Sequence, residues 1–157
     1  MRKGGSLVVP ERSFILIDAQ NIVGAGIFEL RDAKNARNAI DTLIEPSNSD
    51  LVVVATGAKT VFHIADAWPT ARHLVGRGKN GADYALQERI KDTTWVTDRF
   101  NHLYLASGDH EFIQEIECFC KLSFPVTIIG RAGSIFQGYY DLGVEVLEID
   151  GDWDLAA

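Results

Sequence analysis

Short apolar runs alternate with helical patterns along most of this chain, and this alternation constrains the fold more than any other feature. The runs are uninterrupted, which indicates strands that are covered on both faces. Such strands, separated by helices, predict an α/β fold with a mostly parallel sheet of roughly five or six strands flanked by helices. We expect strands at residues 13–18, 51–55, 71–76, 102–107, 125–130 and 144–149, and helices at 33–44, 59–67, 82–93, 111–122 and 134–143.

A single domain is expected to account for most of the chain. The 157 residues suffice for a sizeable core, and 46% of them are hydrophobic while 24% are charged, a composition typical of a globular protein. We expect residues 1–12 to be a flexible N-terminal segment, residues 13–150 to be the domain, and residues 151–157 to be an acidic C-terminal tail.

The sequence contains no pattern typical of a membrane protein or of a targeting signal. No apolar stretch approaches the roughly 18 residues that a bilayer span needs, and the first residues lack an apolar segment of secretory type. The two cysteines, Cys118 and Cys120, lie in a predicted helix at a spacing that disfavours a disulfide or a zinc pair. We therefore expect a cytoplasmic protein without a membrane partner.

Acidic residues occur where the predicted strands end. Asp18 ends the first strand, Asp83 opens the helix after the third, and Asp109 and Glu111 follow the fourth. The carboxyl ends of parallel strands meet at one edge of the sheet, and ligands bind there at the point where strand order reverses. Capping explains a single aspartate at a helix start, but Asp18 does not directly precede a clear helical pattern.

Clustered carboxylates raise one another's pKa unless a cation neutralises them. The four acids therefore predict a site for a hard divalent cation, Mg²⁺ or Mn²⁺, which can activate water and hold phosphate oxygens. Residues two apart on a regular α-helix point about 200° away from each other. Asp109 and Glu111 can therefore share an ion directly only if the turn between them is not α-helical.

Three blocks of sequence resemble the NYN branch of the PIN-like ribonucleases: FILIDAQNI (14–22), GKNGADYAL (78–86) and LYLASGDHEFIQEI (103–116). They match a strand that ends in Asp with Asn three residues later, a Lys/Asn/Gly stretch before a helix-opening Asp, and a strand followed by Ser-Gly-Asp-x-Asp-Phe. The end of the chain is similar to the family's last strand–helix–strand unit. The blocks occur in the family's order, and the resemblance covers roughly residues 13–149.

The resemblance implies a three-layer, Rossmann-like PIN fold and metal-dependent hydrolysis of RNA phosphodiester bonds. Asp18, Asp83 and Asp109 match the family's acidic site and would be catalytic metal ligands. Glu111 stands where the family usually has Asp, so it would either remain a catalytic ligand, shift the metal preference or mark a degenerate site. His110 lies at a position that varies in the family, and we expect it to be an exposed loop residue.

Residues that bind the substrate are expected around these acids. Two polar side chains would position water or phosphate by hydrogen bonding, three basic side chains would neutralise the RNA backbone, and an asparagine would either join them or serve only the turn. The net charge of −7 argues mildly against a broad nucleic-acid-binding face. The expected set comprises Asn21, Arg77, Lys79, Asn80, Ser107 and Arg131.

Other functions stay open. The same fold with a weakened site would be a non-catalytic module that binds RNA or a protein, and a compact nuclease would also suit the toxin of a toxin–antitoxin pair. RNA is the expected partner of the nuclease; a protein partner, such as an antitoxin, and an oligomer are compatible with the sequence.

Two further sequence patterns, of a dinucleotide site and of a phosphotransfer domain, are matched only in part. Residues 76–81 spell the G-x-G-x-x-G of dinucleotide sites, but they follow the third strand rather than the first of a βαβ unit, and Asp83 would face the pyrophosphate. Phosphotransfer domains also place Asp at the end of a first strand. The haloacid-dehalogenase type needs a second Asp two residues later, where this chain has Gln20.

Overall fold

The structure is a computed structural model that describes residues 11–24, 28–78 and 80–150. Most of the predicted N-terminal segment, the predicted C-terminal tail and Lys79 lie outside these ranges. Within them, no helix combines the length and the apolar character that crossing a membrane requires.

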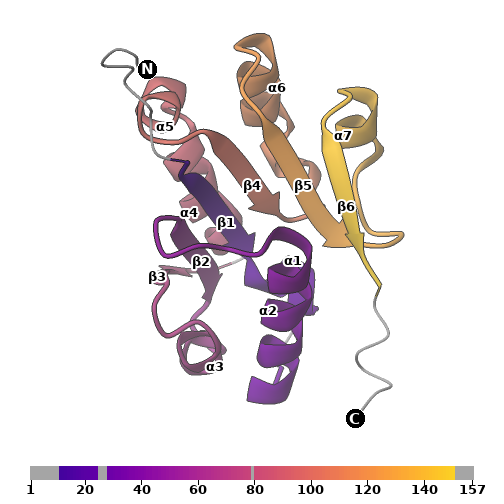
Figure 1. The fold of residues 1–157 in the computed structure, drawn as a ribbon. Coiled ribbons are helices and arrows are strands. Elements are labelled where there is room, and N and C mark those ends of the chain that lie inside the picture. The colour runs from indigo at the N-terminus through magenta and orange to yellow at the C-terminus, as the bar shows by residue number, and fades with distance from the viewer. Residues whose placement is uncertain (1–10, 25–27, 79, 151–157) are drawn as a thin grey trace.

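Six parallel strands form one sheet in the order β3-β2-β1-β4-β5-β6 (Figure 1). This confirms the predicted α/β class and its parallel sheet. The strands are β1 (Ser13–Asp18), β2 (Leu51–Gly57), β3 (Arg72–Gly76), β4 (His102–Ala106), β5 (Val126–Arg131) and β6 (Glu145–Ile149).

Helices cover both faces of the sheet and complete a three-layer, Rossmann-like arrangement (Figure 1). One face packs against α1 (Ala19–Val23), α2 (Leu30–Ile44) and α3 (Val61–Ala67). The other packs against α4 (Gly81–Ile90), α5 (Thr93–Arg99), α6 (Ile113–Lys121) and α7 (Gln137–Asp141). A short 3₁₀ turn, η1 (His110–Phe112), leads into α6.

The central strand β1 explains why the apolar runs are uninterrupted. Phe14 and Leu16 belong to the core beneath α4–α7, whereas Ile15 and Ile17 belong to the core beneath α1–α3. Successive side chains of a strand point to opposite faces, so a strand between two helical layers needs an apolar residue at every position.

Two helices were not predicted from the sequence. The five residues of α1 follow Asp18 directly, and the Asp18 side chain accepts a hydrogen bond from the Asn21 amide and caps the helix. No clear helical pattern follows Asp18 in the sequence, because five residues are too few to show helical periodicity, so this helix and its cap were missed. The predicted helix at 82–93 ends at Ile90, since Asp92 caps the separate helix α5 through the Trp95 amide.

The two-sided burial of β1 predicts a large effect of truncation there. Leu16→Ala should lower the free energy of unfolding by about 2–5 kcal/mol, because Leu16 is fully buried and its loss leaves a cavity. Leu122→Ala, at a side chain that is 56% exposed, should change it by less than about 0.5 kcal/mol. Urea unfolding followed by circular dichroism measures both, and equal effects would contradict the assignment of β1 to the core.

Candidate functional site

The predicted acids lie at the point where the strand order of the sheet reverses. β1 and β4 are neighbours at its centre, and the chain leaves β1 towards one helical layer and β4 towards the other. Asp18 is the last residue of β1, and Asp109 follows β4 by three residues. In open parallel sheets this edge is where ligands bind.

Asp18 is held in place by both strands. Its side chain is almost completely buried, at 2% exposure, and its Oδ2 atom accepts a hydrogen bond of 3.1 Å from the Ser107 hydroxyl. Its Oδ1 atom accepts the Asn21 amide at 3.4 Å, and the Asn21 side-chain oxygen accepts the Gly108 amide at 2.8 Å. These bonds fix the end of β1 against the loop that follows β4.

Asp109 and Glu111 lie on a turn that is not α-helical. Asp109 has an extended backbone, and its Oδ1 atom accepts the Glu111 amide at 3.1 Å at the start of η1. One ligand atom from each of Asp109, His110 and Glu111 lies within 4.8 Å of the others. The geometric condition for Asp109 and Glu111 to share an ion is therefore met.

Asp83 enters the same site from the first turn of α4. Asp18, Asp83 and Asp109 line one cleft of about 230 Å³ together with Gln20, Asn21, Asn80 and Ala82. The structure thus brings together three carboxylates that are far apart in sequence, and Glu111 stands beside them close enough to act on Asp83. We refer to Asp18, Asp83, Asp109 and Glu111 as the acidic cluster.

The carboxyl groups of the acidic cluster perturb one another. Burial raises the pKa of Asp18 well above its usual range, and a hydrogen bond with Asp83 and the charge of Asp83 raise it further. Burial also raises the pKa of Asp83, and the charges of Asp109 and Glu111 add to this rise. Asp18 and Asp83 thus lie close enough for each to affect the ionisation of the other.

His110 is exposed, as predicted, but it is not remote from the acids. Its Nδ1 atom lies 3.1 Å from Asp109 Oδ1, and its Nε2 atom lies 3.8 Å from Glu111 Oε1. A side chain that the sequence indicates only as a loop residue therefore bridges two members of the acidic cluster.

The polar residues expected to bind substrate have different surroundings. Ser107 is fully buried, and its hydroxyl also accepts the Asp109 amide at 3.2 Å, so it positions two acids rather than facing a ligand. Asn21 lines the cleft and also ties β1 to β4. Asn80 lines the cleft in a left-handed conformation, and its side chain makes no capping hydrogen bond to α4.

The structure describes two of the three basic residues expected to bind substrate, Arg77 and Arg131. Arg77 lines an adjoining hollow of about 730 Å³ with Lys59, and this hollow shares Gln20 with the acidic cleft. Arg131 donates a hydrogen bond of 3.1 Å to the Val23 carbonyl, so it holds the end of α1. Lys79 lies outside the described residues.

Residues that support the acidic cluster were missed in the sequence. The Gln87 side-chain amide donates to the Glu111 carbonyl at 2.6 Å, and the Tyr139 hydroxyl donates to the Asp109 carbonyl. Gln87 lies one turn after Asp83, so helical spacing places it on the same face of α4. Tyr139 offered no comparable signal, because only the tertiary fold brings α7 to this loop.

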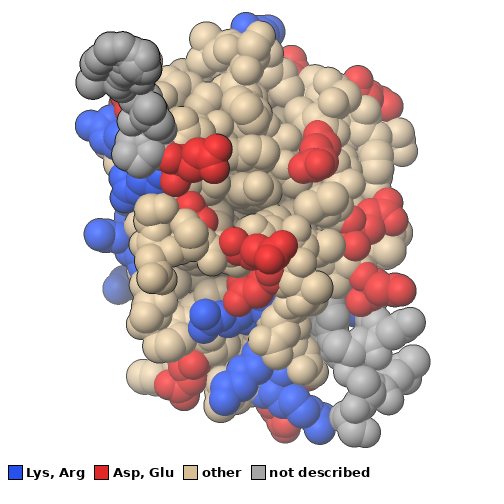
Figure 2. Space-filling view, viewed as in Figure 1, with Lys and Arg blue, Asp and Glu red and all other residues tan. Residues whose placement is uncertain are grey.

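Charged residues of both signs share the face drawn in Figure 2, where blue side chains lie close to red ones. The net charge of −7 is therefore not spread as one repulsive field over this face.

Both cysteines are free thiols, and Cys118 is exposed.

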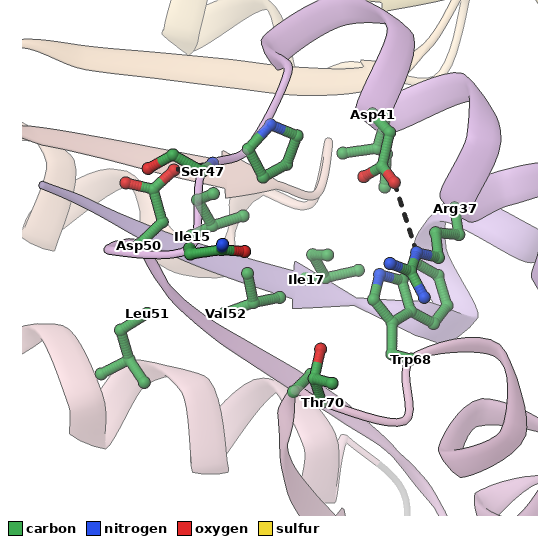
Figure 3. Close-up of a pocket in the computed structure, with 14 residues that line it drawn as sticks. Ile15, Ile17, Arg37, Asp41, Ser47, Asp50, Leu51, Val52, Trp68 and Thr70 are labelled. Atoms are coloured by element: carbon green, nitrogen blue, oxygen red, sulfur yellow. Dashed lines mark hydrogen bonds and ion pairs between the residues drawn. The ribbon is translucent and has the colours of Figure 1, made fainter.

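A separate cavity of about 310 Å³ lies between α2, the loop before β2 and the residues after α3 (Figure 3). Its charged residues include Arg37 and Asp41, which pair with each other at 3.3 Å, and Asp50, whose side chain accepts the amides of Ser13 and Ser47. Asp41 is paired with Arg37 and Asp50 accepts two backbone amides, so this cavity does not present converging carboxylates as the acidic cleft does.

Comparisons with known proteins identify the fold but no family. The structure is similar to the crystal structure of a protein of unknown function from Vibrio parahaemolyticus, with a TM-score of 0.64 and 17% sequence identity over 90% of this chain and 94% of that one. No family model and no curated protein matches the sequence. The resemblance to the NYN branch stays a prediction.

The raised pKa of Asp18 predicts a pH-dependent loss of stability in the absence of metal. The folded state holds the Asp18 proton more tightly than the unfolded chain, so stability falls as the pH rises from the unfolded value of about 3.9 through the raised folded value. In chelator at neutral pH, Asp18→Asn should therefore melt above the wild type, by about 2–4 °C for each kcal/mol gained.

Calorimetry with a chelator measures this difference, which should shrink below a pH of about 3.9 because the wild-type carboxyl is then protonated. Asp98→Asn, at an exposed aspartate on α5, is the matched control and should not change the melting temperature. A lower melting temperature for Asp18→Asn at every pH would contradict the proposed cost of charging Asp18.

Proposed function

We propose that this protein is a metal-dependent ribonuclease that hydrolyses RNA phosphodiester bonds at the acidic cluster, with Mg²⁺ or Mn²⁺ as its cofactor. One observation carries the proposal: carboxylates from three separate segments converge at the switch point of the sheet, and the innermost of them is buried with a raised pKa. Strongly perturbed carboxyl groups in a cleft are typical of functional sites.

The chemistry of the donor set fits a hard divalent cation. The cluster offers carboxylate oxygens, which are the ligands that Mg²⁺ and Mn²⁺ prefer. The cation would offset the burial and the neighbouring charges that raise the pKa of Asp18 and Asp83. When bound, the metal would supply an activated water and would neutralise charge on the phosphate.

Neighbouring residues of the chain would support this chemistry by fixing the positions of the acidic side chains. Ser107 holds Asp18 and the Asp109 amide at once, and Asn21 links the end of β1 to Gly108. Tyr139 holds the Asp109 carbonyl, and Gln87 holds the carbonyl of Glu111. Side chains fixed in this way lose little further freedom when a ligand binds, which favours precise positioning of a phosphate.

The hollow beside the cleft supports an anionic substrate. Lys59 and Arg77 line it, and Gln20 connects it to the acids. A phosphate backbone that reaches the acidic cluster would therefore meet positive charge on the side of β2 and β3, and such contacts position nucleic acid without reading its sequence.

A cleavage assay tests the proposal. Labelled single-stranded RNA should be cut in Mn²⁺ or Mg²⁺ and left intact in chelator, and Asp18→Asn and Asp109→Asn should each lower the rate by about 100-fold or more. Asp98→Asn should cut at the wild-type rate, since its carboxylate is exposed on α5.

Two other results of this assay would contradict the proposal. Cleavage that persists in both site variants would do so, because a contaminant or another site would be responsible. Retention of RNA without cleavage in either metal would favour the non-catalytic binding module instead.

The role of Glu111 can be tested by separating charge from length. Glu111→Gln removes a charge that acts on Asp83, and it should reduce the rise in melting temperature that Mn²⁺ gives the wild type. Glu111→Asp keeps the charge and should retain most of that rise. Thermal denaturation with and without Mn²⁺ measures both variants, and equal loss in the two would mean that the length of the side chain matters more than its charge.

A further inference from the structure

The geometry points to Phe136 as a residue that stacks on an unpaired nucleobase beside the acidic cluster, and so selects single-stranded substrate. This inference rests on the proposed ribonuclease function and assigns a specificity residue to the same site. Phe136 caps the start of α7, and its side chain is 41% exposed although it is large and apolar.

The backbone of Phe136 is fixed to the loop that carries the acids. Its amide donates a hydrogen bond of 2.9 Å to the Gly108 carbonyl, one residue before Asp109. A Cβ atom at Gly108 would lie 2.3 Å from the Ser134 carbonyl oxygen and 3.0 Å from Ile135 Cα, so only glycine allows this approach. Phe136 is thereby held at the rim of the acidic cluster.

Contacts with His110, Tyr139 and Gly138 also fix the orientation of the Phe136 ring. Its centroid lies 5.9 Å from that of His110, the residue that bridges Asp109 and Glu111. It lies 5.9 Å from the Tyr139 ring in an edge arrangement with an interplanar angle of 89°. A Cβ atom at Gly138 would come within 2.4 Å of Phe136 Cε2, so the ring occupies space that the missing side chain leaves open.

A nucleobase is the occupant that fits this surface. An exposed aromatic ring beside a site for phosphate offers a stacking platform, and every base has a face that can use it. A paired base already stacks within its helix, so only an unpaired base would be free to take this position. A neutral base would also meet no repulsion from the neighbouring carboxylates, unlike a second phosphate.

Among the described residues, the other exposed aromatic side chains lie in different surroundings, and Phe62 is on α3 in the opposite helical layer. Tyr140 is similarly exposed at 38% and lies on the same helix, but its hydroxyl donates to Glu148 on β6, away from the acids. Tyr84 follows Asp83 directly on α4, and successive helical residues point about 100° apart. Tyr140 therefore serves as the matched control for Phe136.

The test uses a single-stranded RNA of about eight nucleotides that carries the fluorescent base 2-aminopurine at each position in turn, bound in chelator so that it is not cut. Wild-type protein should quench the fluorescence at one position, and Phe136→Ala should abolish that quenching and weaken binding about tenfold. Phe136→Trp should restore both, and Tyr140→Ala should leave both unchanged.

Two further measurements separate stacking from a structural role. An abasic nucleotide at the quenched position should weaken wild-type binding about tenfold but leave Phe136→Ala binding unaltered, because the two changes remove the same contact. Gly138→Ala, which keeps the phenyl ring but displaces it, should reduce the quenching while circular dichroism shows an intact fold.

The outcomes also distinguish this inference from the proposed function. If RNA is cut in a metal-dependent manner but Phe136→Ala binds and quenches like the wild type, the stacking role is wrong and the ribonuclease stands. If RNA binds and quenches through Phe136 but is never cut, the ribonuclease is wrong and the stacking role stands. Absence of RNA binding overturns the stacking role.

Discussion

The rest of this site depends on holding the Asp18 carboxyl group at the end of a buried strand, where both burial and neighbouring charge oppose its ionisation. Burial is the larger cause of the raised pKa of Asp18, and Asp83 adds to it. Ser107 and the Asn21 amide act in the other direction, because hydrogen bonds to a carboxylate stabilise the charged form. The acid is thus kept in a place where protonation or a bound cation would relieve the cost of its charge.

This constraint explains why so many contacts converge on the loop after β4. Ser107 bonds Asp18 and the Asp109 amide, Asn21 bonds the Gly108 amide, and Tyr139 bonds the Asp109 carbonyl. Repulsion between the carboxylates would otherwise push this loop away from Asp18. Hydrogen bonds from β1, α1 and α7 hold the backbone of the loop in place.

The parts of this structure that local pattern determines could be predicted from the sequence. Apolar runs such as 13–18 predicted the strands. The carboxyl ends of parallel strands meet at one edge of the sheet, and this rule predicted that Asp18, Asp83 and Asp109 converge. The helices α1 and α5 could not be predicted, because the first is too short for periodicity and the second is separated from α4 by a cap at Asp92. Ser107 was expected at the site, but its role in holding two acids, like the position of Phe136, depends on tertiary contacts that no local pattern records.

The order of the strands also resolves the apparent conflict between an acidic protein and an anionic substrate. Along the carboxyl edge, Arg77 follows β3 and Lys59 follows β2, Asp18 ends β1 and Asp109 follows β4, and Phe136 lies beyond β5. Lys59 and Arg77 therefore lie on one side of Asp18 and Asp109 along this edge and Phe136 lies on the other, although Asp83 follows β3 and Arg131 ends β5. In the proposed ribonuclease, one RNA strand would lie across this edge. Its backbone would contact Lys59 and Arg77, its scissile phosphate would lie at the acidic cluster, and an unpaired nucleobase would stack on Phe136. The net charge of −7 does not weigh against this arrangement, because a phosphate responds to the charges within about a Debye length rather than to the total.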